Sequence, residues 1–347
     1  MVAERSDREH GYTRRSVEVD RPEARLSDLF WNILLLIGGF GALWFGAEWL
    51  VRGAARIATD MGISPVVIGL TLVSLGTSAP ELVVGIVAAL DDRTGLLIGN
   101  VMGSNLANIG LILGATAVIR PLAVADRVIS RDVPIMVLVT IFVFPLVLDN
   151  AVVVGDGLIL LGVLVVYVAF TFRTADEDLS QLGQGADADS GEGEDAAHGL
   201  LLNLGLVAAG AVGLALGGQA IVKGASFLAS ELGASEELIG LTVVAVGTSL
   251  PELVTAVVAA ARQQADIAVG NIVGSNIFNL TAVLGVSALV SELPVDSSIL
   301  TRQLPAVLAI SLLVWPITAS ASRVRRSEGV LLLVAYFGFM IWIGFAS

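Results

Sequence analysis

The sequence reads GTSAPE at residues 76–81 and GTSLPE at residues 247–252, and each segment lies near the middle of a long apolar run. Glycine relaxes the backbone, and proline removes one hydrogen bond from the helical ladder. In each segment a serine precedes a glutamate by three residues, the spacing of a capping box, which starts a helix. Both segments therefore predict a helix that breaks and begins again in apolar surroundings.

The composition around these segments is that of a membrane protein. Of the 347 residues, 55% are hydrophobic and 15% are charged, whereas soluble domains carry about 25% charged residues. The apolar runs have the length of roughly 20 residues that crosses a bilayer as a helix. This excludes a soluble enzyme, a nucleic-acid binder and an outer-membrane barrel, whose strands alternate over ~10 residues. We expect an all-α membrane protein with ten transmembrane helices, at 30–51, 66–90, 96–119, 133–148, 152–172, 200–221, 238–261, 267–289, 304–319 and 330–345.

The two halves of the chain are related in sequence. With a shift of 171 residues, 22 of the 46 positions in 69–114 are identical to those in 240–285. Glycines and prolines stay in register beyond this stretch, so the chain carries an internal duplication. Each unit has five spans, an odd number, so the copies must enter the membrane from opposite sides. This predicts two inverted-topology five-helix repeats, as in alternating-access transporters, with discontinuous helices in spans 2 and 7.

The chain is expected to have four parts. A polar N-terminal tail, 1–28, precedes the first five-span repeat, 29–172, and the second five-span repeat covers 200–347. The segment 173–199 between them is acidic and rich in Gly, Ser and Ala, which predicts a disordered linker. Arginines gather in the loops on the side of the linker. We therefore expect a multi-pass protein of the cell (plasma) membrane, with the linker cytoplasmic and the N-terminus extracellular.

Glu81 and Glu252 are a repeated pair of acids deep in apolar runs. An acid within the membrane costs ~2.5–3.5 kcal/mol on insertion scales. One copy alone could be a proline kink that buries a protonated glutamate, but two copies at repeat-related positions favour a function. Glu48 is different, because it lies four residues before Arg52 near the end of a span and its repeat counterpart is Gln219. It predicts a paired or snorkelling acid at the membrane boundary.

A second motif places neutral oxygens next to these acids. It reads GNVMGSN at 99–105 and GNIVGSN at 270–276. Polar residues spaced by four share one helical face, and they are Asn100, Ser104 and Asn108 in the first copy and Asn271, Ser275 and Asn279 in the second. The glycines of the motif, also four apart, predict close helix packing. Two carboxylates, amide and hydroxyl oxygens and freed carbonyls suit a hard cation such as Ca²⁺, which takes ~6–8 oxygens. There is no cysteine, and both histidines lie outside the spans.

The paired G-T-S-x-P-E and G-N-x-x-G-S-N motifs resemble the two alpha-repeats of the sodium/calcium exchanger family, prokaryotic type, within the calcium/cation antiporter superfamily. The resemblance covers nearly the whole chain and implies a secondary antiporter that exchanges Na⁺ for Ca²⁺ by alternating access, typically three for one. It implies Glu81 and Glu252 as central ligands of both ions, with the main-chain carbonyls of Thr77 and Thr248 completing the Ca²⁺ site. The further implied residues are Ser78, Ser104, Ser249 and Ser275, with main-chain oxygens near Ser74 and Ala245, for the outer Na⁺ sites, and Asn108 and Asn279 beside the central site.

The resemblance also bears on coupling. Some relatives, including the potassium-dependent branch, carry aspartate at the position of Asn279, so asparagine favours K⁺-independent exchange. Two central carboxylates make the Ca²⁺-loaded site neutral and leave one positive charge with three Na⁺, which predicts electrogenic exchange. We expect no cofactor and no obligatory protein partner beyond the two ions and the lipid bilayer. The short acidic linker has no room for the calcium-binding domains of eukaryotic members.

Three alternatives remain open at this point. An H⁺/Ca²⁺ exchanger of the same superfamily would use the two glutamates through protonation, although the serine-rich surroundings favour Na⁺. A cation channel would show flux without a counter-ion. A membrane scaffold without transport would have no use for the central acids.

Overall fold

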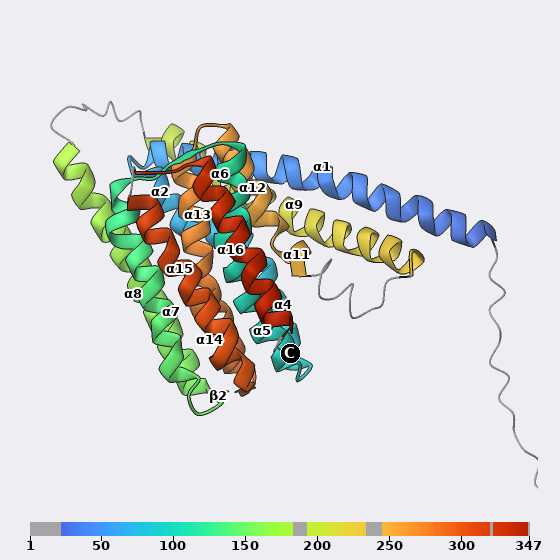
Figure 1. Ribbon diagram of the computed structural model, residues 1–347. Coiled ribbons are helices and arrows are strands. Elements are labelled where there is room, and N and C mark those ends of the chain that lie inside the picture. Colours follow the sequence, from blue (N-terminus) through green and yellow to red (C-terminus); the bar gives the residue numbers. More distant parts are fainter. Residues whose placement is uncertain (1–21, 183–192, 234–244, 320–321, 346–347) are drawn as a thin grey trace, which may run out of the picture.

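The computed structural model describes residues 22–182, 193–233, 245–319 and 322–345, which form a helical bundle (Figure 1). The first half contains α1 (Pro22–Asp60), α2 (Pro65–Ile68), α3 (Ser74–Thr77), α4 (Ala79–Leu90), α5 (Thr94–Leu106), α6 (Gly114–Ile119), α7 (Val133–Leu146) and α8 (Val154–Leu182). The second half contains α9 (Gly193–Glu231), α11 (Ala245–Thr248), α12 (Leu250–Ala261), α13 (Ala265–Phe278), α14 (Leu284–Val290), α15 (Leu304–Ala319) and α16 (Arg326–Phe345). Segments of π-helix join several of these: η1 (Gly69–Val73), η2 (Ala107–Leu113), η3 (Val128–Asp132), η5 (Asn279–Val283) and η6 (Ile299–Gln303).

The helices confirm the predicted all-α membrane architecture. Within the described ranges, eight helical stretches are long and apolar enough to cross a membrane, and α2 to α4 provides a ninth if its bent halves form one span. The seventh predicted span, 238–261, is described only from Ala245 onward, as α11 and the short apolar helix α12.

Three helices reach into segments that the sequence assigns to the tail and the linker. α1 begins at Pro22, α8 continues to Leu182, and α9 begins at Gly193. The added turns contain Ala, Leu, Glu and Gln, which are good helix formers that lose little side-chain freedom in a helix. Residues 183–192 of the predicted linker lie outside the described residues.

α1 and α9 form a closely packed pair. They run side by side and cross the rest of the bundle at an angle (Figure 1). A Cβ atom at Gly210 of α9 would lie 2.6 Å from the carbonyl oxygen of Gly46 in α1, and one at Gly217 would lie 2.8 Å from the backbone nitrogen of Leu43. Only glycine permits this backbone separation, which is the small-residue packing typical of membrane helices.

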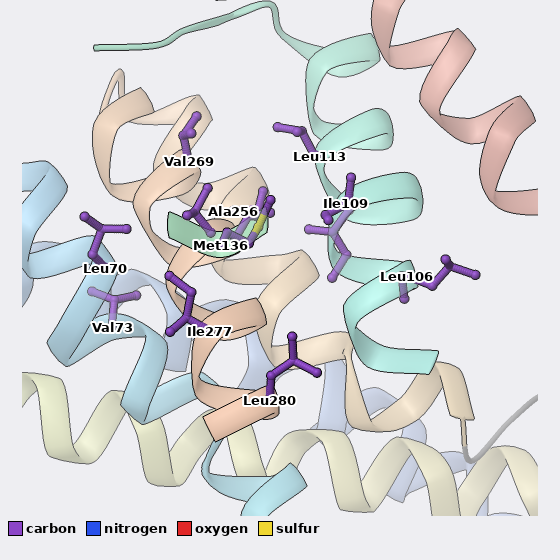
Figure 2. Packing of buried hydrophobic residues seen from close by; sticks show 14 of the residues in the cluster. Leu70, Val73, Leu106, Ile109, Leu113, Met136, Ala256, Val269, Ile277 and Leu280 are labelled. Carbon is purple, nitrogen blue, oxygen red and sulfur yellow. The ribbon is translucent and has the colours of Figure 1, made fainter. Parts of the chain in front are cut away.

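The centre of the bundle is formed by the two stretches that carry the G-N-x-x-G-S-N motif. In an 18-residue window of each stretch, 89% of the residues of α13–α14 and 72% of those of α5–α6 are buried, whereas 11% of those of α16 are. Figure 2 shows Leu70 and Val73 of η1 on one side of Ile277 in α13, with Leu106 and Ile109 on the other side. The polar motifs therefore lie in the interior, and the outer helices expose apolar side chains.

Local structure recurs at the offset of the sequence duplication. η3 and η6 are related by 171 residues, as are β1 (Leu122–Ala123) and β3 (Leu293–Pro294). Each of these short strands pairs antiparallel with a strand of the other half: β1 with β4 (Arg323–Val324), and β2 (Ala151–Val152) with β3. The two halves thus repeat the same elements and interlock.

Candidate functional site

Both GTSxPE segments interrupt a helix. α3 ends at Thr77 and α4 begins at Ala79, with the intervening Ser78 at φ −84° and ψ 3° and Pro80 in the first turn of α4. The helix axis bends by 44° there. In the second half α11 ends before Ser249, which has nearly the same angles, φ −90° and ψ 3°. The proline favours a break at this place, because it lacks one backbone hydrogen bond and its ring clashes with the preceding turn of a continuing helix.

The predicted capping box is wrong in its bonding. Neither Ser78 nor Ser249 caps the helix that follows it with its side chain. The Ser78 hydroxyl instead donates a hydrogen bond across the repeats to Oε1 of Glu252, at 3.2 Å. A hydrogen bond to an ionised carboxylate is stronger than one between neutral groups. The Ser78 side chain thus points to the centre of the molecule and to the other half.

Glu81 and Glu252 lie in the first turns of α4 and α12 and are almost completely buried, with exposed fractions of 1% and 0%. The two carboxylates are near enough to interact electrostatically, and the Ser104 side chain lies beside Glu81. Within the described residues, both oxygens of Glu81 and Oε2 of Glu252 have no hydrogen-bond partner. Burying such oxygens without a partner is costly. Their arrangement is suited to a cation that both carboxylates contact.

Threonine hydroxyls connect the two halves around this pair. The Thr77 hydroxyl donates to Oδ1 of Asn271, at 2.9 Å, and lies 3.4 Å from the Ser275 hydroxyl. The related contact, from Thr248 to Oδ1 of Asn100, is longer at 3.4 Å. The threonine at each helix break therefore contacts the polar helical face of the other half, which includes Asn271 and Ser275 for Thr77 and Asn100 for Thr248.

Ser74 adds a second link between the halves. Its hydroxyl is 2.7 Å from the carbonyl oxygen of Gly69 and 3.1 Å from that of Asn271. Ala245, its repeat counterpart, is the first residue of α11, and the residues before it lie outside the described ranges.

Asn108 and Asn279 are buried where η2 and η5 interrupt the α-helices. Within the described chain, neither side-chain amide has a hydrogen-bond partner. π-helical segments occur frequently at functional sites. The place beside the central site that the resemblance implies for these two residues stays a prediction.

The close approach predicted for the motif glycines is observed for one copy. A Cβ atom at Gly270 would lie 2.8 Å from the carbonyl oxygen of Val66, and one at Gly274 would lie 2.5 Å from that of Leu70. For Gly99 and Gly103, in contrast, no atom of the described residues lies within 4 Å of such a Cβ. The α13 copy is thus covered by α2 and η1, whereas the segment that corresponds to them in the second half, 236–244, lies outside the described residues.

Sequence reasoning placed Asn100 and Asn271 on the polar stripe but gave them no function. The signal for both asparagines was their spacing of four from the serines. That spacing does not indicate that they contact the threonines of the other half.

The described residues contain no group of three or more His, Cys, Asp or Glu side chains that could hold a metal ion. A cation bound here would therefore depend on two carboxylates and many neutral oxygens.

The comparisons with known proteins agree with this arrangement. The family model described as sodium/calcium exchanger protein matches residues 31–173 and again 202–345. The putative antiporter CaxA of Alkalimonas amylolytica is 36% identical over 316 residues, which cover 89% of this chain and 97% of that protein. The sodium/calcium exchanger MaX1 of Methanosarcina acetivorans is 34% identical, again with 89% and 97% coverage.

A solved structure has the same fold. The sodium-calcium exchanger NCX_Mj, in crystals soaked with 10 mM Na⁺ and no Ca²⁺, superposes with a TM-score of 0.78 at 30% identity, over 90% of this chain and 99% of that one. These relatives are transporters and not enzymes. The chain is a multi-pass membrane protein of the cation/Ca²⁺ antiporter type, and it belongs to the sodium/calcium exchanger family.

Proposed function

We propose that this protein exchanges Na⁺ for Ca²⁺ by alternating access, with ten spans arranged as two inverted-topology repeats. The observation that carries the proposal is the central carboxylate pair. Glu81 and Glu252 come from repeat-related helix starts, are fully buried, and have oxygens that no described group satisfies. Lipid cannot satisfy them either. Cations that enter and leave the site from alternate sides of the membrane would satisfy these oxygens.

The ligand set combines both repeats. Glu81, Glu252 and the main-chain carbonyls of Thr77 and Thr248 would bind Ca²⁺. The outer Na⁺ positions would use neutral oxygens, and these are the side chains of Ser78, Ser104, Ser249 and Ser275 and the main chain at Ser74 and Ala245, with Asn108 and Asn279 beside the centre. Contacts of Ser78 with Glu252 and of Thr77 with Ser275 support this set, because they already bring first-half and second-half groups together.

The proposed exchange is electrogenic and independent of K⁺. Two carboxylates neutralise one Ca²⁺, whereas three Na⁺ leave one net positive charge, and Asn279 supplies no third carboxylate.

The proposed location is the plasma membrane, with the segment 173–199 on the cytoplasmic side and the N-terminus outside. Arginines support this orientation: Arg120 bonds the last turn of α12 at Ala261, and Arg262 follows directly, so arginine-bearing ends meet on one side.

The test is uptake of radioactive Ca²⁺ into proteoliposomes preloaded with Na⁺, choline or K⁺ at one fixed pH. We expect uptake only with internal Na⁺. Glu81→Gln and Glu252→Gln should each lower it by about 100-fold or more, because even outer-shell partners of a metal site are worth ~10–100-fold. Thr140→Val is the control, since the buried Thr140 hydroxyl bonds only its own helix, at Met136.

The other outcomes separate the alternatives. Uptake driven by a pH gradient without Na⁺ would establish proton coupling through the same glutamates. Uptake without any counter-ion would establish a channel. Unchanged flux in both glutamine variants would remove the site assignment.

A further inference from the structure

An ion-pair cluster joins α1 to the end of α12, away from the central site. The Glu48 carboxylate binds Arg52 one turn further along α1, at 2.6 Å, and also binds Arg262, the residue that ends α12. Glu48 is only 9% exposed, so its charge depends on these partners. Sequence reasoning expected the pairing with Arg52 alone. Arg262 lies 214 residues away in sequence.

The cluster joins helices from different halves of the chain. α1 and α9 are held together by glycine contacts along their length, such as Gly46 against Gly210. α12 packs against α1 and carries Glu252 in its first turn. The Glu48–Arg262 pair therefore links the α1–α9 pair to the helix that supplies one central carboxylate.

The duplication does not reproduce this link. At the offset of 171 residues, Glu48 corresponds to Gln219 in α9, and Arg262 corresponds to Asp91 after α4. Gln219 and Asp91 are both exposed, whereas Glu48 is buried. A neutral amide and a carboxylate form no ion pair. Only one of the two repeat-related boundaries can thus be held by opposite charges.

We propose that the Glu48–Arg262 pair is a one-sided latch that makes the two access states unequal in free energy. In an inverted-repeat carrier, the two repeats exchange conformations when access changes sides. The contact of α1 with α12 then gives way to the contact of α9 with α4, and Arg262 leaves Glu48. Arg52 stays one turn from Glu48 in either state, because both are on α1. The latch therefore favours the state seen here, and the inference rests on alternating access.

A position at the contact between the halves reports the state. Ile267 at the start of α13 is 0% exposed, and its main chain lies against Gly69 of η1. A movement of the two halves relative to each other would open this contact. Because the chain has no cysteine, Ile267→Cys provides a single thiol whose alkylation rate in proteoliposomes measures how often the contact opens.

Loss of the latch should expose position 267 more often. We expect Glu48→Gln and Arg262→Gln each to raise the alkylation rate of Ile267→Cys by roughly two- to fivefold, the factor that a partly exposed ion pair is worth. Arg52→Gln is the matched control and should have a smaller effect, because it leaves the pairing with Arg262 in place.

A gain-of-function variant keeps the test independent of folding damage. Gln219→Glu combined with Asp91→Arg adds the missing pair at the other boundary and should also raise alkylation of Ile267→Cys. The same alkylation is measured with Na⁺ or with Ca²⁺ present. If the ions change the alkylation rate of Ile267→Cys but none of the substitutions at the ion pair does, the latch is wrong. If neither the ions nor the substitutions change that rate, the alternating access on which the latch rests is contradicted as well.

Discussion

Thr77 and Asn271 illustrate how single residues set the shape of the site. The carbonyl of Thr77 is a proposed Ca²⁺ ligand, and its side chain is held by Asn271 from the other half, at 2.9 Å. Asn271 is fully buried, and its amide nitrogen has no partner among the described residues. Holding the threonine in place fixes the direction of the main-chain oxygen. Asn271 therefore acts as a positioning residue.

Removing this hydrogen bond should weaken Ca²⁺ transport without abolishing it. We expect Thr77→Val to raise the KM for Ca²⁺ by about 10-fold, in the range of outer-shell partners of metal sites. Thr77→Ser keeps the hydroxyl and should retain a KM near the original. Equal KM values for the valine and serine variants at position 77 would contradict the assignment.

At the scale of elements, the packing of α13 on η1 gives a prediction about stability. A methyl group at Gly274 would collide with the Leu70 carbonyl and the Ser74 hydroxyl, whereas one at Gly162, which is exposed on α8, meets no described atom within 4 Å. Overpacking of an interior costs ~1–3 kcal/mol. Gly274→Ala should therefore lower the melting temperature in detergent by several degrees, and Gly162→Ala should not lower it. Equal shifts in the two variants would show that the glycine contact is unimportant for stability.

The elements themselves were largely predictable from the sequence. Hydrophobic run lengths predicted the eight long apolar helices of the described residues. The conjunction of glycine, proline and glutamate predicted an interruption where α4 and α12 begin. These signals are local, so no knowledge of tertiary contacts is needed to interpret them. The helical extension of α8 to Leu182 was missed because acidic residues that suggest disorder are also compatible with an exposed helix.

Contacts between the halves were not predictable in the same way. The spacing of Ser78 and Glu81 indicated a bond within one helix, but Ser78 bonds Glu252 instead. The pairing of Glu48 with Arg262 likewise depends on how α1 lies against α12. Such contacts depend on the relative placement of elements far apart in the chain, and a spacing rule carries no information about that.

At the scale of the whole molecule, the charge of the loaded site determines which step senses the membrane potential. With two carboxylates, the Ca²⁺-loaded centre is neutral, and the Na⁺-loaded centre carries one positive charge. Moving one charge through 100 mV is worth ~2.3 kcal/mol, or about 50-fold in the steady-state Ca²⁺ gradient. Proteoliposomes with an imposed potential should show this shift during Na⁺-driven uptake, and a gradient indifferent to potential would indicate electroneutral exchange.

The same reasoning separates the Ca²⁺ step from the Na⁺ step. Exchange of Ca²⁺ for Ca²⁺ moves only the neutral loaded form, so its rate should not respond to an imposed potential. Asn279→Asp adds a third carboxylate to the buried centre, and the Ca²⁺-loaded form then carries one negative charge. In that variant the rate of Ca²⁺ exchange should become dependent on potential, while Na⁺-driven uptake still moves one net charge per cycle. A potential-independent rate in the variant would mean either that the introduced carboxylate takes up a proton or that position 279 lies outside the field of the site. A repeat at higher pH distinguishes the two, because only a protonated carboxyl group would then lose its proton and bring dependence on potential.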